Sequence, residues 1–231
     1  MLENPKVKTQ SGVQSSVTLR EIYRLLFARY GPQHWWPGET PFEVMVGAIL
    51  TQSCAWTNVE KAIGALKSVG LLSPEALRNA SLDDVAALVH PCGYYNVKAK
   101  KLKALVEWLK GYCGDDIASL SKVDTINLRS ELLNVYGIGE ETADSILLYA
   151  CGKPVFVIDA YTRRILARIG IANHCKSYAD FKALFMKNLP HDRAMFNEYH
   201  ALFVKLGKET CKKTPVCEGC CLMEMCRNSK T

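Results

Sequence analysis

The chain has 231 residues, of which 48% are hydrophobic and 23% are charged. This balance is typical of a globular protein with a packed core, and it excludes a disordered or fibrous chain. The formal net charge of +6 permits a polyanionic partner, although many proteins that bind none carry a similar charge. The sequence shows neither a leader pattern nor an apolar run long enough to cross a bilayer, so we expect a cytoplasmic protein.

Apolar residues recur at helical spacing along most of the chain, so we predict an all-α fold. Residues 1–16 are polar and aperiodic and predict a mobile tail, and Thr18 is the candidate N-cap of a first helix that ends at Gly31-Pro32. The β-like run Val155 to Ile158 is too short to build a sheet and predicts a buried connector. Further helices are predicted at about 41–52, 55–69, 74–80, 82–89, 97–113, 126–135, 141–151, 160–169, 178–188 and 193–207.

Half of the ten cysteines crowd into residues 211–226. In a reducing compartment, thiolates grouped in one loop indicate metal ligation rather than disulfides. Zinc is a chemically sound occupant, because four thiolates suit its tetrahedral coordination. The four thiolates with suitable spacing are Cys211, Cys217, Cys220 and Cys226. The scattered cysteines, which we expect to be inert and at least half-buried, are Cys54, Cys92, Cys113, Cys151 and Cys175.

Two predicted helices are joined by Gly137-Ile138-Gly139, a helix–hairpin–helix pattern. The two glycines are expected to let the backbone turn without Cβ clashes, and Ile138 is expected to plug the hairpin into the core. Backbone N–H groups near the positive end of the following helix would suit a DNA phosphate. A plain tight link between two helices is the alternative, because G-x-G alone is a weak pattern.

The stretch from Leu133 to Arg168 resembles the module of the endonuclease III superfamily of DNA glycosylases, in which a Gly/Pro-rich loop and an aspartate follow the hairpin. Gly152-Lys153-Pro154 and Asp159 match the loop and the catalytic position. With the cysteine loop and the Pro41-Phe42-Glu43 segment, the likeness extends over about residues 18–226.

The resemblance implies two lobes. Residues 39–153 would form a helical barrel that includes the helix–hairpin–helix at about 126–151. Residues 1–38 and 154–231 would form the second lobe, with the catalytic aspartate and the cysteine loop. The family pattern also implies that the four spaced cysteines hold a 4Fe-4S cluster rather than zinc, with Cys221 spare.

The resemblance gives Asp159 and Glu141 the catalytic positions. A carboxylate at Asp159 can stabilise the positive charge that develops on the sugar when an N-glycosidic bond breaks, and it can orient water. The alternative for Asp159 is an N-cap of the helix that begins at Ala160. Bifunctional relatives carry a nucleophilic lysine where this chain has Glu141, so the resemblance implies a monofunctional glycosylase. The alternative for Glu141 is a solvated glutamate in a first helical turn.

Three tryptophans form the candidate base pocket: Trp35, Trp36 and Trp56. Their faces suit a cationic base such as 3-methyladenine. Together with Glu141 they are similar to the bacterial 3-methyladenine DNA glycosylase branch of the superfamily. Each tryptophan can instead be plain core. A glycosylase for mismatched or deaminated bases and a non-catalytic iron–sulfur DNA-binding protein are the rival functions.

The resemblance also implies contacts with double-stranded DNA that contains a damaged base. Tyr94 matches the residue that wedges into the duplex, and Gln52 matches a residue that enters the vacated space. Lys98 and its lysine neighbours would approach phosphates, although a lysine-rich helical face is usually just solvated. We expect a monomer that makes no membrane contact and is nucleoid-associated if the source is bacterial.

Overall fold

The computed structural model describes residues 6–227, with side chains from residue 16 onward, and this part of the chain is helical with no β-strand. The all-α prediction is confirmed. The chain divides into two compact units, one of which is Trp36–Lys153. No helix in the described part combines the length and the apolar character that a membrane span requires.

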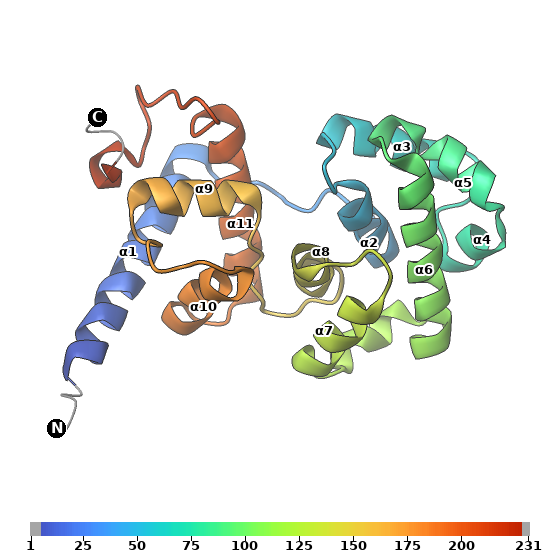
Figure 1. Cartoon of the computed structure of the whole chain (residues 1–231), viewed down its shortest axis with the longest axis horizontal. Coiled ribbons are helices and arrows are strands. Elements are labelled where there is room, and N and C mark those ends of the chain that lie inside the picture. Colours follow the sequence, from blue (N-terminus) through green and yellow to red (C-terminus); the bar gives the residue numbers. More distant parts are fainter. Residues whose placement is uncertain (1–5, 228–231) are drawn as a thin grey trace. The chain divides into compact units, whose positions relative to one another are not determined.

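The unit that contains both ends of the described chain is built from four long helices, coloured blue and orange to red in Figure 1. Its core is aromatic: the rings of Phe156 and Phe185 stack with centroids 3.7 Å apart, and Tyr199 packs edge-on against both. Helix α11 packs against α1 and α9. The helices are α1 (Lys6–Tyr30), α9 (Ala160–Ile169), α10 (Tyr178–Asn188) and α11 (Arg193–Glu209).

The second unit packs α6 against α4 and α5, and α2 against α3, α6 and the segment that follows α8. Helix α2 is buried from Phe42 to Leu50, so it is the central helix of this unit. Its helices are α2 (Pro41–Leu50), α3 (Trp56–Ser68), α4 (Pro74–Asn79), α5 (Leu82–Leu88), α6 (Tyr95–Cys113), α7 (Thr125–Asn134) and α8 (Glu140–Ser145), and it also contains the short turns η1 (His90–Cys92) and η2 (Ile117–Lys122) and the π-helical turn η3 (Ile146–Ala150).

Two segments test the sequence predictions closely. Val155 to Ile158 is fully or almost fully buried and lies in no strand or helix, so the prediction of a buried connector is confirmed. The mobile tail predicted for residues 1–16 is wrong for residues 6–16, because α1 already begins at Lys6 and Thr18 lies inside it, and residues 1–5 lie outside the described part of the chain. Residues 6–30 contain no proline, and most of the polar residues there are compatible with a helix. The helix can therefore extend toward the N-terminus beyond the apolar pattern on which the prediction was based.

Candidate active site and DNA interface

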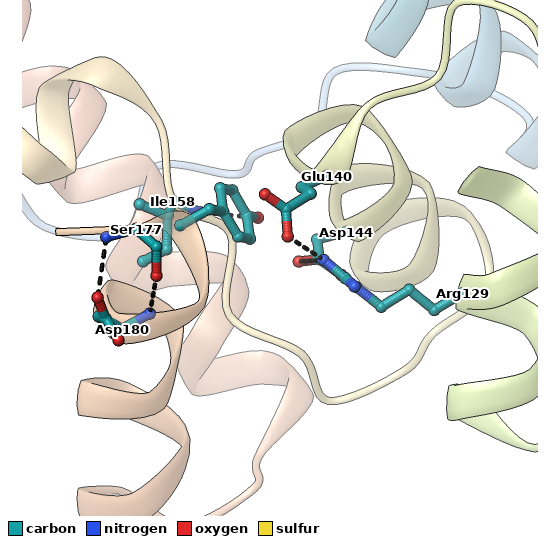
Figure 2. Close-up of polar contacts among 7 residues, drawn as sticks. Arg129, Glu140, Asp144, Ile158, Ser177 and Asp180 are labelled. Atoms are coloured by element: carbon teal, nitrogen blue, oxygen red, sulfur yellow. Dashed lines mark hydrogen bonds and ion pairs between the residues drawn. The ribbon is translucent and has the colours of Figure 1, made fainter. Parts of the chain in front are cut away.

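Asp159 begins α9 as its N-cap. Its Oδ1 accepts a hydrogen bond of 2.7 Å from the backbone N–H of Thr162, and its side chain is almost fully buried. The residue before it is also anchored, because the N–H of Ile158 donates to the hydroxyl of Tyr178 at the start of α10. Figure 2 shows Ile158 and the capping box of α10, in which Ser177 and Asp180 exchange backbone-to-side-chain hydrogen bonds. The carboxylate is therefore held on a well-fixed backbone.

The second carboxylate oxygen of Asp159 faces a buried histidine. Oδ2 lies 3.6 Å from Nε2 of His200, which is on α11. Burial by itself raises the pKa of Asp159, but the nearby imidazole of His200, together with hydrogen bonding from Thr162, outweighs burial and brings the pKa below its ordinary value. The lowered pKa favours the ionised form of this carboxylate.

The hairpin between α7 and α8 turns at Gly137, where φ is +82°, a conformation that favours glycine. A Cβ at this position would fall on the side-chain methylenes of Lys101. Ile138 is 5% exposed, so the prediction that it plugs the hairpin into the core is confirmed. The expectation for Gly139 is corrected: its φ is −94° and a Cβ would meet nothing, so the fold itself does not require glycine there.

Ion pairs between Arg129 and two carboxylates stabilise the hairpin (Figure 2). Nε of Arg129, on α7, lies 2.8 Å from the carboxylate of Asp144, whose side chain is fully buried on α8. The same guanidinium lies 3.4 Å from Glu140 in the first turn of α8. Because a buried carboxylate without a cationic partner is costly, this pairing couples the two helices of the hairpin. Glu141, the next residue, is exposed.

The structure brings two of the three candidate pocket tryptophans together. Trp36 and Trp56 meet edge to face with centroids 5.4 Å apart, and Tyr149 lies 5.3 Å from Trp36. Both indoles are partly exposed, and their edge-to-face geometry does not form a parallel sandwich. Trp35 belongs to the other unit, where the ammonium of Lys208 lies over its ring at 5.8 Å.

Gln52 lies just after α2 and binds the hairpin. Its amide nitrogen donates to the carbonyl of Gly137 at 3.0 Å and lies 2.9 Å from the Thr142 hydroxyl, and its amide oxygen accepts from Lys101. These contacts hold Gln52 against the hairpin in this structure.

Tyr94 is 76% exposed and has a left-handed backbone with φ of 46°. It forms the N-cap residue of α6 without capping the helix through its side chain. A large exposed aromatic in a strained backbone is an unusual combination, and function can maintain such strain.

The expectation that Lys98 approaches a DNA phosphate is corrected by the structure. Lys98 is 2% exposed, and its ammonium donates to the carbonyls of Leu50 at 2.9 Å and Cys92 at 2.8 Å. Burial lowers the pKa of this lysine. Lys98 lies in a lysine-rich run of the sequence, but its position on the inner face of α6 lets its ammonium link the end of α2 to the turn η1.

The cysteine loop follows α11. All ten cysteines are free, and the four spaced ones are partly exposed. A guanidinium N–H of Arg168 donates to the sulfur of Cys211 at 3.2 Å, and burial together with the three other thiols raises the pKa of Cys220. Within residues 6–227, no three His, Cys, Asp or Glu side chains are arranged to hold a metal ion.

The scattered cysteines match their expected environment. Cys92 and Cys151 are buried, and burial raises the pKa of each thiol to about 12. Cys54, Cys113 and Cys175 are partly exposed. A thiol with so high a pKa is a poor nucleophile, which agrees with inert side chains at Cys92 and Cys151.

Sequence reasoning did not identify two residues of these sites. His200 was hidden within the amphipathic pattern of α11, although a lone histidine beside Tyr199 and Leu202 on a buried helix is a usable signal. Arg129 carried no signal, because its partner Asp144 is fifteen residues away.

Residues 46–191 match the HhH-GPD superfamily of base excision DNA repair proteins. The chain belongs to this superfamily, which its all-helical fold and its glycine hairpin also indicate. A Methanocaldococcus jannaschii protein provisionally named a DNA repair glycosylase is 45% identical over 207 residues, which cover 89% of this chain and 94% of that protein.

Two further comparisons agree with this family. Endonuclease III of Thermotoga maritima is 28% identical over 90% of this chain and 92% of its own length. The crystal structure of the H. pylori 3-methyladenine DNA glycosylase bound to 1,N6-ethenoadenine superposes with a TM-score of 0.74 and 26% identity, over 84% of this chain and 97% of that chain. The resemblance to the endonuclease III superfamily is therefore confirmed.

Proposed function

We propose that this protein is a monofunctional DNA glycosylase of base excision repair, which hydrolyses the N-glycosidic bond of alkylated bases such as 3-methyladenine in double-stranded DNA. The observation that carries the proposal is the carboxylate of Asp159, which is almost fully buried, oriented by the Thr162 amide and held ionised. A charge fixed in this way suits a reaction whose transition state is cationic.

In the proposed reaction, the negative charge of Asp159 stabilises the oxocarbenium-like sugar as the bond to the base breaks. Water then adds to C1′, and its proton passes to the carboxylate or to solvent. The leaving base takes the bonding electron pair. An N3-methylated adenine is a good leaving group because it already carries positive charge, so little further protonation is needed.

The absence of a nucleophilic lysine at Glu141 supports hydrolysis without strand cleavage. A carboxylate cannot form the imine that leads to cleavage. Glu141 is exposed in the first turn of α8 and could place a negative charge near a cationic base.

Two features support the alkylated base as the substrate. The partly exposed faces of Trp36 and Trp56 offer stacking surfaces, each of which gains about 0.5–2 kcal/mol against a cation. The H. pylori protein with a similar fold is a 3-methyladenine DNA glycosylase. Because the two indoles meet edge to face, we propose that one of them stacks on the base and the other supports it.

The test is a base-release assay on matched duplexes. Methylated DNA and duplexes with ethenoadenine, with uracil opposite guanine and with thymine opposite guanine are incubated with enzyme in excess, and released bases are identified by chromatography. We expect release of 3-methyladenine, alkali-labile sites and no borohydride-trapped protein–DNA adduct. Release of uracil or thymine with 3-methyladenine left in place would overturn the substrate, whereas a trapped adduct would overturn the monofunctional mechanism. No release from any duplex would overturn the glycosylase itself.

We also propose that Cys211, Cys217, Cys220 and Cys226 hold a 4Fe-4S cluster. Four thiols on one loop, with the guanidinium of Arg168 beside Cys211, form a donor set that suits a cluster with four thiolate ligands. The cluster would supply a structural cross-link for the loop and takes no part in the proposed hydrolysis.

Metal analysis of anaerobically purified protein tests this assignment. We expect iron and sulfide, loss of both in Cys217→Ser, and wild-type iron content in Cys221→Ser, which serves as the matched control. Stoichiometric zinc without iron would contradict the cluster, and loss of iron in the Cys221 variant would contradict the ligand set.

A further inference from the structure

We propose that His200 is a positioning residue that fixes the orientation and the charge of the Asp159 carboxylate. The inference rests on the proposed function of Asp159. It adds a residue on α11 to a site that the sequence placed only at the start of α9.

The geometry gives each oxygen of Asp159 one protein partner. Oδ1 accepts from the Thr162 amide at 2.7 Å, and Oδ2 faces Nε2 of His200 at 3.6 Å. With one oxygen tied to the helix and the other beside an imidazole, rotation of the carboxyl group is opposed from both sides. The side chain of Asp159 is only 11% exposed and that of His200 only 6% exposed, so both side chains are largely shielded from solvent.

Burial makes this partnership necessary for the proposed reaction. A carboxyl group removed from water without a compensating charge or donor tends to take up a proton. A protonated Asp159 could not stabilise a cationic sugar. Without the imidazole, only the hydrogen bonding of Thr162 would oppose that tendency, because His200 and Thr162 are the groups that lower the pKa of Asp159.

The charged groups of α9 have other partners. The guanidinium of Arg163 lies over the rings of Tyr178 and Phe181. Arg164 donates to the carbonyls of Cys211 and Gly207. Neither arginine is therefore positioned to replace His200 beside the carboxylate.

Titratable groups on the other packed elements are also engaged elsewhere. Tyr178 of α10 receives the N–H of Ile158, and Tyr23 of α1 packs on the ring of Tyr199. On α11 itself, Tyr199 donates to the carbonyl of Leu19, and Lys208 lies over Trp35. His200 is the ionisable side chain that the structure pairs with Asp159.

Two substitutions remove the imidazole and differ in whether a polar N–H group remains beside the carboxylate. His200→Leu leaves no such group, so burial of Asp159 is less opposed, and the fall of the base-release rate at low pH should begin about one pH unit higher than in wild type. His200→Gln keeps an N–H donor near Oδ2 on a neutral side chain, so the fall should shift less. His174→Gln changes an exposed histidine of the same unit and should leave the fall at its wild-type position.

The experiment measures single-turnover base release against pH for these three variants, for wild type and for Asp159→Asn. Circular dichroism and DNA affinity are measured in parallel. If His200→Leu does not fold, the pH profile of His200→Gln tests the inference instead. The inference is supported if the fall of the rate at low pH begins at a higher pH in His200→Leu than in His200→Gln, and at a higher pH in His200→Gln than in wild type. An equal loss of rate at every pH, with the fall at low pH unmoved, would overturn it while leaving the proposed function intact. Undiminished release by Asp159→Asn would instead overturn the proposed function.

Discussion

Helices α8 and α9 begin in opposite ways. The N-cap of α8 is Gly139, and no side chain caps that helix. The N-cap of α9 is Asp159, whose own carboxylate binds the Thr162 amide in the first turn. The first N–H groups of a helix need acceptors, and the positive end of its dipole favours an anion. At α9 the N-cap side chain itself binds a first-turn amide, whereas the first turn of α8 carries the carboxylates of Glu140 and Glu141 but has no capping side chain.

The comparison shows how one feature of backbone chemistry can serve two purposes. We propose that the uncapped N-terminus of α8 binds a DNA phosphate through its first N–H groups, as the sequence pattern predicts, and that the capped N-terminus of α9 orients the carboxylate that acts on the sugar. The two sites also differ in exposure: Gly139 is exposed and Asp159 is buried. Salt, substitution and pH should therefore affect them differently.

Replacement of the Asp159 carboxylate should have the largest effect on base release. Asp159→Asn should lower single-turnover base release by about a thousandfold, because the charge that stabilises the transition state is lost. Asparagine is also a good N-cap, so the free energy of unfolding should change by less than about 1 kcal/mol. Rapid-quench assays and thermal unfolding measure the two quantities.

The matched control is Asp192→Asn, because Asp192 is the N-cap of α11 and accepts from the Met195 amide. It makes the same chemical change at a helix start that has no proposed role in catalysis. Equal losses of activity in both variants would mean that the effect comes from capping.

Substitution of the hairpin glycines should have an intermediate effect. Gly137→Ala forces a left-handed backbone on a residue with a Cβ and displaces Lys101, so it should destabilise the protein by about 1–3 kcal/mol. DNA affinity should fall about tenfold, equivalent to about 1.4 kcal/mol, because the distorted hairpin no longer presents its amides. Fluorescence anisotropy with a non-hydrolysable lesion analogue measures the affinity.

Gly139→Ala is the control for backbone strain. Its φ of −94° and the open space around it predict a stability within about 0.5 kcal/mol of wild type. If DNA affinity also falls in this stable variant, the added methyl group blocks the approach of a phosphate, which supports the binding role of α8. Unchanged affinity in both glycine variants would remove the hairpin from the DNA interface.

Added salt should have the smallest effect, and it should weaken DNA binding without slowing base release. Each phosphate contact contributes a slope of about −0.9 to the dependence of log affinity on log salt concentration. The rate of base release at saturating enzyme should stay nearly constant, because Asp159 and His200 are buried and poorly screened. A release rate that falls as steeply as the affinity would contradict the separation.

The positions of residues whose surroundings are set by their neighbours in sequence were predictable from the sequence. Asp159 follows a buried run and precedes a helix, and Ile138 lies between two glycines, so neighbouring residues define both positions. His200 and Lys98 depend instead on contacts distant in sequence: His200 meets a residue 41 positions away, and Lys98 binds a carbonyl 48 positions away. Hydrophobic periodicity reports that a face is buried and does not identify its polar partners.

Element boundaries show the same limit. The predicted helix at 141–151 is present, but its second half is the π-helical turn η3, where the N–H of Cys151 donates to the carbonyl of Ile146. Tertiary packing selects such turns, and they have no reliable local signature. Both Gly137 and Gly139 were expected to be needed for the turn, and the two are distinguished by their backbone angles and by the space around each Cβ position.

The two buried hydrogen bonds of Lys98 have a consequence for the loop that carries Tyr94. A left-handed tyrosine in an exposed loop would ordinarily sample many conformations, and DNA would have to select the productive one. Lys98 joins the carbonyl of Cys92, two residues before Tyr94, to the end of α2, so this loop loses its conformational entropy when the protein folds. The exposed ring of Tyr94 is therefore carried on a backbone that needs no further ordering before it meets a partner, which lowers the entropic cost of any contact that it makes.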